Sequence, residues 1–302
     1  MSRNMFFNSR SIAFCLVFFS LTLIADAQHW TYDDVQAWCN VSETCCKGKH
    51  QSPIDLTRSF PTTLYTTVDE FTFTNYDKKP KSVILENNGK QIVGEFADIT
   101  PKPTVSGAGL SETYSLDYFR FAWGRNDKEG SEHSINGFHG PLELHLIHYN
   151  TKFANTSVAA DSGEKDALLM ISIIYSLSLW DNPTLTKITD KLKNVTYANE
   201  KVKAEGFAPK NFLPSCQSRF FKYYGSYTIP PCTEVVLHLI FEKTQYVSWA
   251  QMENFRTLYE TEKGVEPKVP INHSFRPIQQ LNDRTVAHIQ ERNNFCWVLP
   301  WS

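Results

Sequence analysis

The sequence has no excess of charge of one sign, since 30 Lys and Arg residues nearly balance 32 Asp and Glu residues. Blocks of basic residues with interleaved aromatic residues are also missing, so no nucleic-acid partner is expected. No segment rich in Gly, Ser or Pro divides residues 28–302, and no repeat of fixed period occurs. Hydrophobic residues make up 41% of the chain, which suffices for a large core. We therefore predict a single domain over residues 28–302, with a short C-terminal extension.

A long apolar run is also lacking. The longest candidate, residues 12–24, is shorter than the roughly 18 to 20 residues of a bilayer span. Two arginines precede it and an Ala-Asp-Ala sequence follows it, which is the pattern of a signal peptide and its cleavage site. We predict a signal peptide at residues 1–27 and a secreted, extracellular product, with a membrane anchor as the alternative. The C-terminus has no tail long enough for lipid-anchor exchange, so no membrane anchor is expected.

The cysteines form no Cys-x-x-Cys pair, so a thiolate zinc site is not indicated. After removal of the signal peptide an even set remains, which predicts three disulfides in an oxidising compartment: Cys39, Cys45, Cys46, Cys216, Cys232 and Cys296. Four Asn-x-Ser/Thr sequons predict surface positions that are open to glycosylation, namely Asn40, Asn155, Asn194 and Asn272. Their occupancy stays open at this point.

Short alternating segments dominate the chain and predict strands at residues 71–74, 82–85, 91–96, 116–124, 142–149 and 235–241. The nearly continuous apolar segment 167–180 favours a buried strand over a helix. Helical spacing predicts helices at 184–192 and 249–259. Residues 28–53 show no clear periodicity, which predicts a loop-built segment fixed by disulfides and aromatic packing. The expected class is α+β.

The strand at 116–124 carries the most informative alternation. Three side chains point one way and three the other: Tyr118, Arg120 and Ala122 against Phe119, Phe121 and Trp123. The aromatic face is typical of a core. The opposite face, with a single arginine, is a candidate functional site.

Several motifs occur in a fixed order along the chain: Gln51-Ser-Pro-Ile54, Trp123-Gly124, Gly130-Ser-Glu-His133, Glu143-Leu-His-Leu-Ile-His-Tyr-Asn150, Gly225-Ser-Tyr-Thr-Ile-Pro-Pro-Cys232, Phe275-Arg-Pro277 and Leu281-Asn-Asp-Arg284. In order and spacing they resemble the α-class carbonic anhydrases, over nearly the whole mature chain. The resemblance implies a large, twisted, mainly antiparallel sheet with short peripheral helices. It also implies a conical cavity that reaches the sheet.

The resemblance implies a zinc held by three imidazoles, with an open position where water is activated to attack carbon dioxide. Two of these ligands alternate on one strand as His-Phe-His-Trp-Gly, where this chain has Arg120-Phe-Ala-Trp-Gly. The first ligand position therefore holds Arg120, the second holds Ala122, and only the third, His145, is retained. Neither arginine nor alanine offers a lone pair to a metal. No cofactor is expected, with zinc retained only if the ligand set is altered.

Other histidines do not obviously replace the missing ligands. His148 lies three residues along a strand from His145 and should face the opposite way. His133 matches a family position that hydrogen-bonds within the fold, and His139 lies in a predicted turn. A site rebuilt from these residues remains the alternative.

Other parts of the family's machinery are present. Glu132 and Thr228 match the pair that orients the zinc-bound hydroxide, and Glu143 matches the carboxylate that supports the third ligand. The competing interpretation is that Glu132, Thr228 and Tyr223 serve only as buried polar contacts. Lys90 stands at the proton-shuttle position, where a lysine is a poor shuttle at neutral pH.

Arginine at the first ligand position also occurs in the non-catalytic carbonic-anhydrase-related proteins, which this chain therefore resembles more than it resembles the enzymes. We hypothesise that Arg120 replaces the charge of zinc and pairs with Glu143 or Glu132. The alternative is that it extends into solvent. Tyr118 and Tyr227 stand where the family has smaller or more polar residues, so the cavity gains bulk.

The resemblance also implies disulfide pairings. Secreted members tie the segment before the Gln-Ser-Pro-Ile motif to the cysteine after Pro-Pro, which maps onto Cys46 and Cys232. Cys39 with Cys45 is then the expected local bridge, which leaves Cys216 to meet Cys296.

Three functions compete. The first is a secreted, catalytically inactive protein that acts through its surface in binding, matrix or storage, with an unknown extracellular protein or glycan partner. The second is a carbonic anhydrase that hydrates carbon dioxide to bicarbonate through an altered zinc site, so whether the chain is an enzyme stays open. The third is a small-anion pocket centred on Arg120. Fold likeness alone cannot choose among them.

Overall fold

The computed structural model describes residues 30–57 and 63–291 of the chain. The predicted signal peptide at 1–27 and Cys296 lie outside the described residues. None of the helices described is long and apolar enough to cross a membrane.

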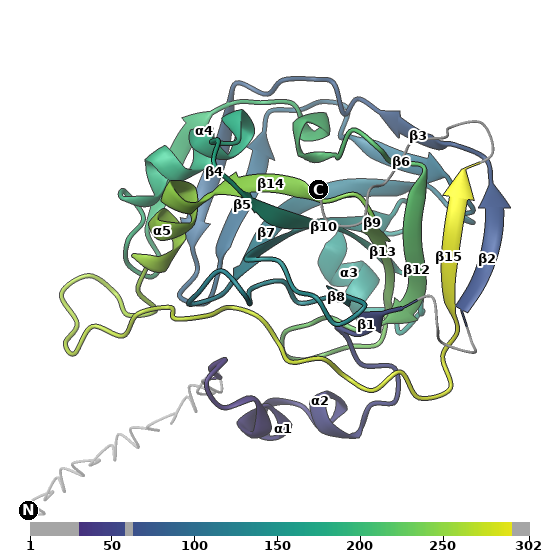
Figure 1. The fold of residues 1–302 in the computed structure, drawn as a ribbon, viewed down its shortest axis with the longest axis horizontal. Helices are drawn as coiled ribbons and strands as arrows, with labels where there is room; N and C mark the ends of the chain where they lie inside the picture. The colour runs from purple at the N-terminus through teal and green to yellow at the C-terminus, as the bar shows by residue number, and fades with distance from the viewer. Residues whose placement is uncertain (1–29, 58–62, 292–302) are drawn as a thin grey trace, which may run out of the picture.

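One large twisted sheet dominates the fold (Figure 1). It has 13 strands, and its main path runs through β11 (Lys201–Glu205), β4 (Ser82–Asn87), β5 (Ile92–Ala97), β7 (Tyr114–Trp123), β9 (Leu142–Asn150), β10 (Leu168–Ser178), β13 (Val236–Phe241), β12 (Arg219–Gly225), β15 (Val286–Glu291) and β2 (Thr63–Val68). Beside this path, β14 (Gln245–Ser248) pairs with β10, while β6 (Thr104–Gly107) joins β3 (Phe71–Thr74) to β7. A separate two-stranded sheet contains β1 (Asp55–Leu56) and β8 (Ser134–Ile135).

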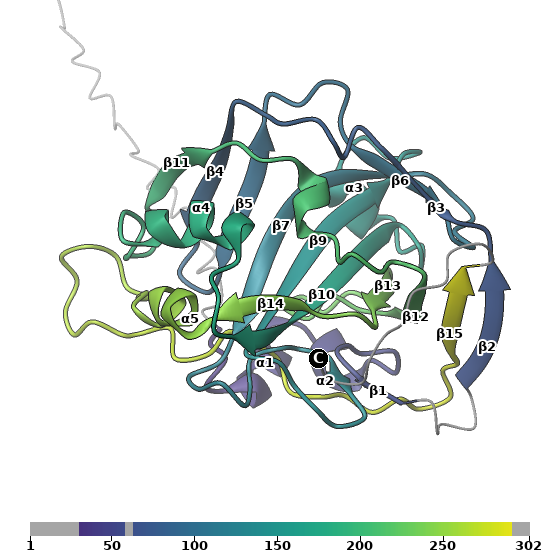
Figure 2. The same ribbon diagram turned by 45° about the horizontal axis from the view of Figure 1, so that its top comes forward.

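Most neighbouring strands are antiparallel, and the exceptions are β10 with β13, β10 with β14, β15 with β2, and β1 with β8. The turned view in Figure 2 shows the twist of the sheet, with α4 (Pro183–Leu192) and α5 (Trp249–Arg256) together at one side. The predicted α+β class, with a mainly antiparallel sheet and short peripheral helices, is confirmed.

Both predicted helices form. Asn182 caps α4 by accepting hydrogen bonds from the backbone of Thr184 and Leu185, and Ser248 with Gln251 forms a capping box at the start of α5. Each predicted strand is also present, with bounds close to those expected, as for 167–180 against β10.

The N-terminal segment is less irregular than its sequence indicates. It contains η1 (Val35–Ala37), α1 (Trp38–Val41) and α2 (Thr44–Lys47), where we predicted a loop. Such short turns show no helical period in the sequence, and tertiary contacts rather than propensity stabilise them. Two further short helical segments, α3 (Thr156–Asp161) and η2 (Pro209–Phe212), were also not predicted.

The alternation along β7 places its aromatic face in the main core. Phe119, Phe121 and Trp123 belong to the largest buried cluster, and both phenylalanines contact Phe212. Leu116 lies in the same cluster although its parity should place it on the other face. The register shifts between Leu116 and Tyr118, and such a bulge inserts one residue and reverses the facing of the residues before it.

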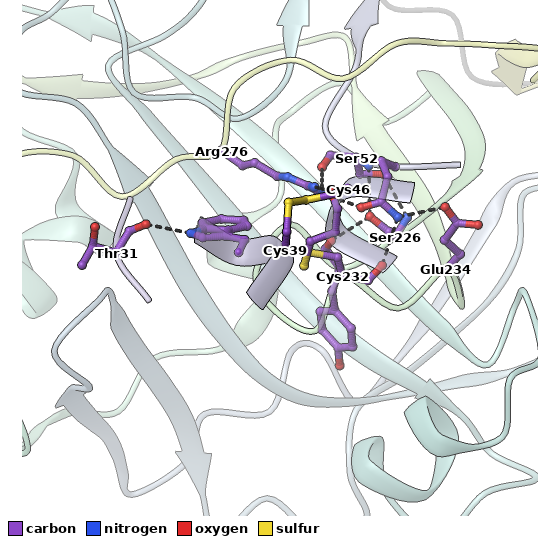
Figure 3. The surroundings of a disulfide bond; sticks show 12 residues. Thr31, Cys39, Cys46, Ser52, Ser226, Cys232, Glu234 and Arg276 are labelled. Carbon is purple, nitrogen blue, oxygen red and sulfur yellow. Dashed lines mark hydrogen bonds between the residues drawn. A yellow bond between two sulfur atoms is a disulfide. The ribbon is translucent and has the colours of Figure 1, made fainter. Parts of the chain in front are cut away.

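The disulfides differ from those predicted. The structure joins Cys39 to Cys46, with a Cα–Cα distance of 5.5 Å, and Cys45 to Cys232, at 5.0 Å. Both predicted pairings, Cys46 with Cys232 and Cys39 with Cys45, are therefore wrong. Adjacent residues on a helix point about 100° apart, and α2 directs Cys45 inward to the cluster that holds Cys232. Figure 3 shows the surroundings of the local bridge.

Cys216 is also disulfide-bonded. Its predicted partner, Cys296, lies outside the described residues, so that pairing stays a prediction. The four sequon asparagines are all exposed, namely Asn40, Asn155, Asn194 and Asn272. Their exposure is compatible with glycosylation, which remains a prediction.

Candidate functional site

Two neighbouring strands bring the three ligand positions together. Arg120 on β7 pairs in register with His145 on β9, and Ala122 pairs with Glu143. All four side chains are buried, and Arg120 is only 1% exposed. The structure thus gathers the residues that the sequence singled out on one face of the sheet.

The guanidinium of Arg120 is held by three side chains. Nη1 donates to Oε1 of Gln91 at 2.8 Å, and Nη2 donates to Oγ1 of Thr228 at 2.5 Å. Nη2 also lies 3.7 Å from Oε2 of Glu132. The hypothesis that Arg120 pairs with Glu132 is confirmed, and the alternative that it extends into solvent is wrong.

Charge and burial act in opposite directions on this arginine. Burial is the largest single influence and lowers the pKa of the Arg120 guanidinium. Attraction to Glu132, together with smaller contributions from neighbouring tyrosines, outweighs burial, so that the pKa lies above its ordinary value. The hydroxyl of Thr228 accepts from Arg120 and donates to Glu132. The three side chains therefore form a closed polar triangle, in which Arg120 contacts both Thr228 and Glu132 and these two are bonded to each other.

Glu143 organises a second polar cluster rather than pairing with Arg120. Its Oε1 accepts from Nδ1 of His133 at 2.7 Å and from Nε2 of His145 at 2.8 Å, and its Oε2 accepts from the backbone of His133 at 2.8 Å. The hydroxyl of Tyr223 lies 2.8 Å from Nε2 of His133 and donates to Ser52. Burial raises the pKa of the Glu143 carboxyl, but the two histidines together lower it by more. The net pKa therefore lies well below its ordinary value.

One atom at this site matches a metal ligand. Nδ1 of His145 is buried and has no hydrogen-bond partner within the described residues, as expected for a nitrogen that faces a metal position. The residues beside it are Arg120 and Ala122, which supply a cation and a methyl group. The donor set therefore does not fit a three-imidazole zinc site.

Among the described residues, one group of side chains could in principle hold a metal: His133, Glu143 and His145, with candidate atoms within 4.8 Å of one another. A tetrahedral zinc with bonds near 2.1 Å would hold its ligand atoms about 3.4 Å apart. The nitrogens of His133 and His145 instead lie 2.7 and 2.8 Å from the same carboxylate oxygen. This spacing is that of hydrogen bonds, so the three side chains form a hydrogen-bonded cluster in which Nδ1 of His145 alone is left without a partner among the described residues.

His148 faces away from this cluster, as predicted. Its Nε2 is bonded to the hydroxyl of Tyr76, and its Nδ1 lies 3.0 Å from the carbonyl of Leu146. Lys90, at the shuttle position, pairs with Glu260 at 3.0 Å and lies 5.6 Å from the ring centroid of Trp30. An ion-paired ammonium is a poor proton carrier at neutral pH.

Two residues of the site were missed by sequence reasoning. Gln91 binds Arg120, and its amide also donates to the carbonyl of Ser274 at 2.9 Å. Tyr32 is buried close to Arg120; burial first, and Glu132 second, raise the pKa of its hydroxyl well above the ordinary value. Gln91 directly precedes β5, whose register with β7 is not readable from the sequence, and Tyr32 lies in the segment without periodicity.

The side chains beside the site are bulky and largely apolar. Tyr227 belongs to a buried cluster with Ile147, Met170 and Val236, and Tyr118 packs against it. Burial raises the pKa of both tyrosine hydroxyls. Tyr118 and Tyr227 thus contribute bulk to this face, while the predicted gain relative to the family stays a prediction.

The geometry agrees with comparisons of the whole sequence. The family model of eukaryotic-type carbonic anhydrases matches residues 33–290. The chain is 33% identical over 271 residues to "Putative carbonic anhydrase 3" of Caenorhabditis elegans, which covers 86% of this chain and 98% of the relative. It is 31% identical over 292 residues to "Carbonic anhydrase 15" of Mus musculus, covering 92% and 89%, and 30% identical over 266 residues to "Carbonic anhydrase 3" of Sus scrofa, covering 86% and 98%. The chain belongs to the eukaryotic-type carbonic anhydrase family.

Proposed function

We propose that this chain is a secreted, non-catalytic member of the family, in which a buried arginine replaces zinc. It acts through its surface as a binding, matrix or storage protein, with an extracellular protein or glycan as partner. The observation that carries the proposal is the placement of Arg120, which is 1% exposed and bonded to Gln91, Thr228 and Glu132.

This placement opposes hydration chemistry in two ways. The cation stands at the first ligand position, where its charge repels a metal ion. It also occupies the acceptor site of Thr228, the hydroxyl that would orient an attacking hydroxide. Glu132 then serves as the counter-charge of Arg120, and Thr228 bridges the two, because neither charge is stable when buried alone.

A small-anion site centred on Arg120 is not favoured, because its two terminal nitrogens are already bonded to side chains. Hydration through an altered zinc site remains the second candidate, and the unpartnered Nδ1 of His145 is the one observation in its favour.

Zinc content and carbon dioxide hydration of the purified protein, measured together, test the proposal. We expect zinc far below one equivalent and hydration at the rate of buffer alone. A three-histidine member of the family, purified in the same way, serves as the positive control. Near-stoichiometric zinc with hydration well above buffer would overturn the proposal in favour of the second candidate.

A further inference from the structure

A cavity of about 410 Å³ lies where β12 ends and β13 and β15 begin, beside His50 of the N-terminal segment. These strands are neighbours at one side of the sheet (Figure 1). Lys222 and Tyr224 alternate along β12 and so share a face, and their register partners Ala287 and Leu237 line the same cavity. The volume falls in the range of small-molecule sites, roughly 300–1,000 Å³.

Three cations line this cavity: Lys165, Lys222 and Arg284. None of them forms an ion pair with a carboxylate of residues 30–57 or 63–291. Lys222 donates to the carbonyl of Gly109 at 2.6 Å, and Arg284 donates to three backbone carbonyls, the shortest at 2.7 Å from Gln280. The ammonium of Lys165 lies 4.6 Å from the ring centroid of Tyr224.

The carboxylates near the cavity act on Arg284 only at a distance, because neither Glu234 nor Asp283 forms an ion pair with it among the described residues. Glu234 is the acid of the lining, and its Oε1 already accepts from the backbone of His50 at 2.7 Å and from Gln51 at 2.8 Å. Burial lowers the pKa of Lys222 with no opposing carboxylate, and it lowers the pKa of Arg284 although Tyr223, Glu234 and Asp283 oppose the shift. A bound anion would relieve the cost of this burial.

The walls between the cations are apolar. The rings of Tyr223 and Tyr224 and the side chains of Leu237 and Ala287 supply them. A ligand that satisfies both features carries one acidic group on an aromatic or aliphatic body. We propose that this cavity binds a small amphipathic organic anion, with the acidic group between Lys165 and Lys222 and the apolar body against Tyr224 and Leu237.

The cavity does not include Arg120, Glu132 or Thr228, so the inference stands whether or not the chain binds zinc. Two fluorescent probes that differ only in a sulfonate group test it: 8-anilinonaphthalene-1-sulfonate and its neutral analogue N-phenyl-1-naphthylamine. We expect saturable one-to-one binding of the sulfonate and at least tenfold weaker binding of the neutral probe.

The variant Lys165→Gln with Lys222→Gln should weaken sulfonate binding at least tenfold. The matched control, Lys128→Gln with Lys210→Gln, removes the same charge from exposed lysines and should leave affinity within twofold. Circular dichroism and thermal unfolding check that each variant is folded. Equal affinity for both probes, equal weakening by both double variants, or no saturable binding would overturn the proposal.

Discussion

Arg120 is the residue on which the site depends. A fully buried guanidinium is costly to desolvate. It is tolerated here because Glu132 supplies a counter-charge and because Gln91 and Thr228 accept hydrogen bonds from it. Breaking such a pair from one side is far more damaging than replacing both members, because one charge is left buried alone.

Replacing this residue should therefore destabilise the fold. We expect Arg120→Ala to lower the free energy of unfolding by about 3–5 kcal/mol, measured by urea denaturation. Arg125→Ala, on an exposed side chain, is the control and should change it by less than about 0.5 kcal/mol. An Arg120→Ala protein as stable as the parent would show that the arginine does not compensate the carboxylate.

The buried imidazole of His148 should make folding sensitive to acid. Burial lowers its pKa from 6.5 to about 4, although hydrogen bonds to the carbonyls of Leu169 and Leu146 oppose the shift. Between these values the unfolded chain binds a proton that the folded chain does not, so the free energy of unfolding falls as the pH drops. The loss approaches about 3 kcal/mol near pH 4.

Urea denaturation at a series of pH values from 7 down to 4 measures this effect. His148→Gln should be less stable than the parent at pH 7 but should lose less stability on acidification. The lowered pKa of His238, also caused first by burial, contributes equally to both proteins. If the variant shows the full pH dependence of the parent, His148 is not the titrating group.

At the scale of elements, the pairing of β7 with β9 determines where the lost ligands lie. The register places Arg120 beside His145 and Ala122 beside Glu143, and strand pairing alone fixes these positions. If Arg120, Ala122 and His145 hold the ligand positions that the family resemblance implies, the backbone keeps the arrangement of a metal site without two of its donors.

Restoring the donors tests that arrangement. Arg120→His combined with Ala122→His should bind close to one equivalent of zinc, because Nδ1 of His145 is already unpartnered. Elemental analysis after dialysis measures it. The single variant Arg120→His, with two imidazoles, is the control and should bind much less. Failure of the double variant to retain zinc would contradict the assignment of the ligand positions.

The two disulfides close loops of very different length, with sequence separations of 7 and 187 residues. The chain-entropy model gives about 2 kcal/mol for the short loop and about 5 kcal/mol for the long one. Cys45→Ala with Cys232→Ala should therefore destabilise more than Cys39→Ala with Cys46→Ala. Thermal unfolding of both pairs measures the difference, and the reverse order would contradict the connectivity.

For the whole molecule, sequence patterns predicted what depends on local periodicity. Seven strands, the helices α4 and α5 and the alternation of β7 follow from side-chain spacing: β3, β4, β5, β7, β9, β10 and β13. The other strands of the described residues, among them β12, β15 and β2, were not predicted. The disulfide partners, the bulge after Leu116 and the contacts of Tyr32 and Gln91 with Arg120 do not follow from spacing either. Each of these depends on how segments far apart in the sequence meet, and no local pattern encodes that meeting.

A whole-molecule consequence concerns metal removal. If Arg120 replaces zinc, the folded state gains nothing from metal binding, so dialysis against a chelator should leave the midpoint of thermal unfolding unchanged. A three-histidine relative treated in the same way is the control and should unfold at lower temperature. A clear fall in this protein's midpoint would indicate a bound metal that contributes to folding.

The order of strands at the right of Figure 1 also bears on how the protein is made. β2, among the first strands to be synthesised, pairs along the main sheet only with β15, the last one described. A nascent chain must therefore hold β2 and one side of β12 unpaired until β15 leaves the ribosome. Chains cut short before β15 would expose two open strand edges, which favour aggregation. Chains that include β15 can therefore cover these edges, whereas chains truncated before it are expected to aggregate.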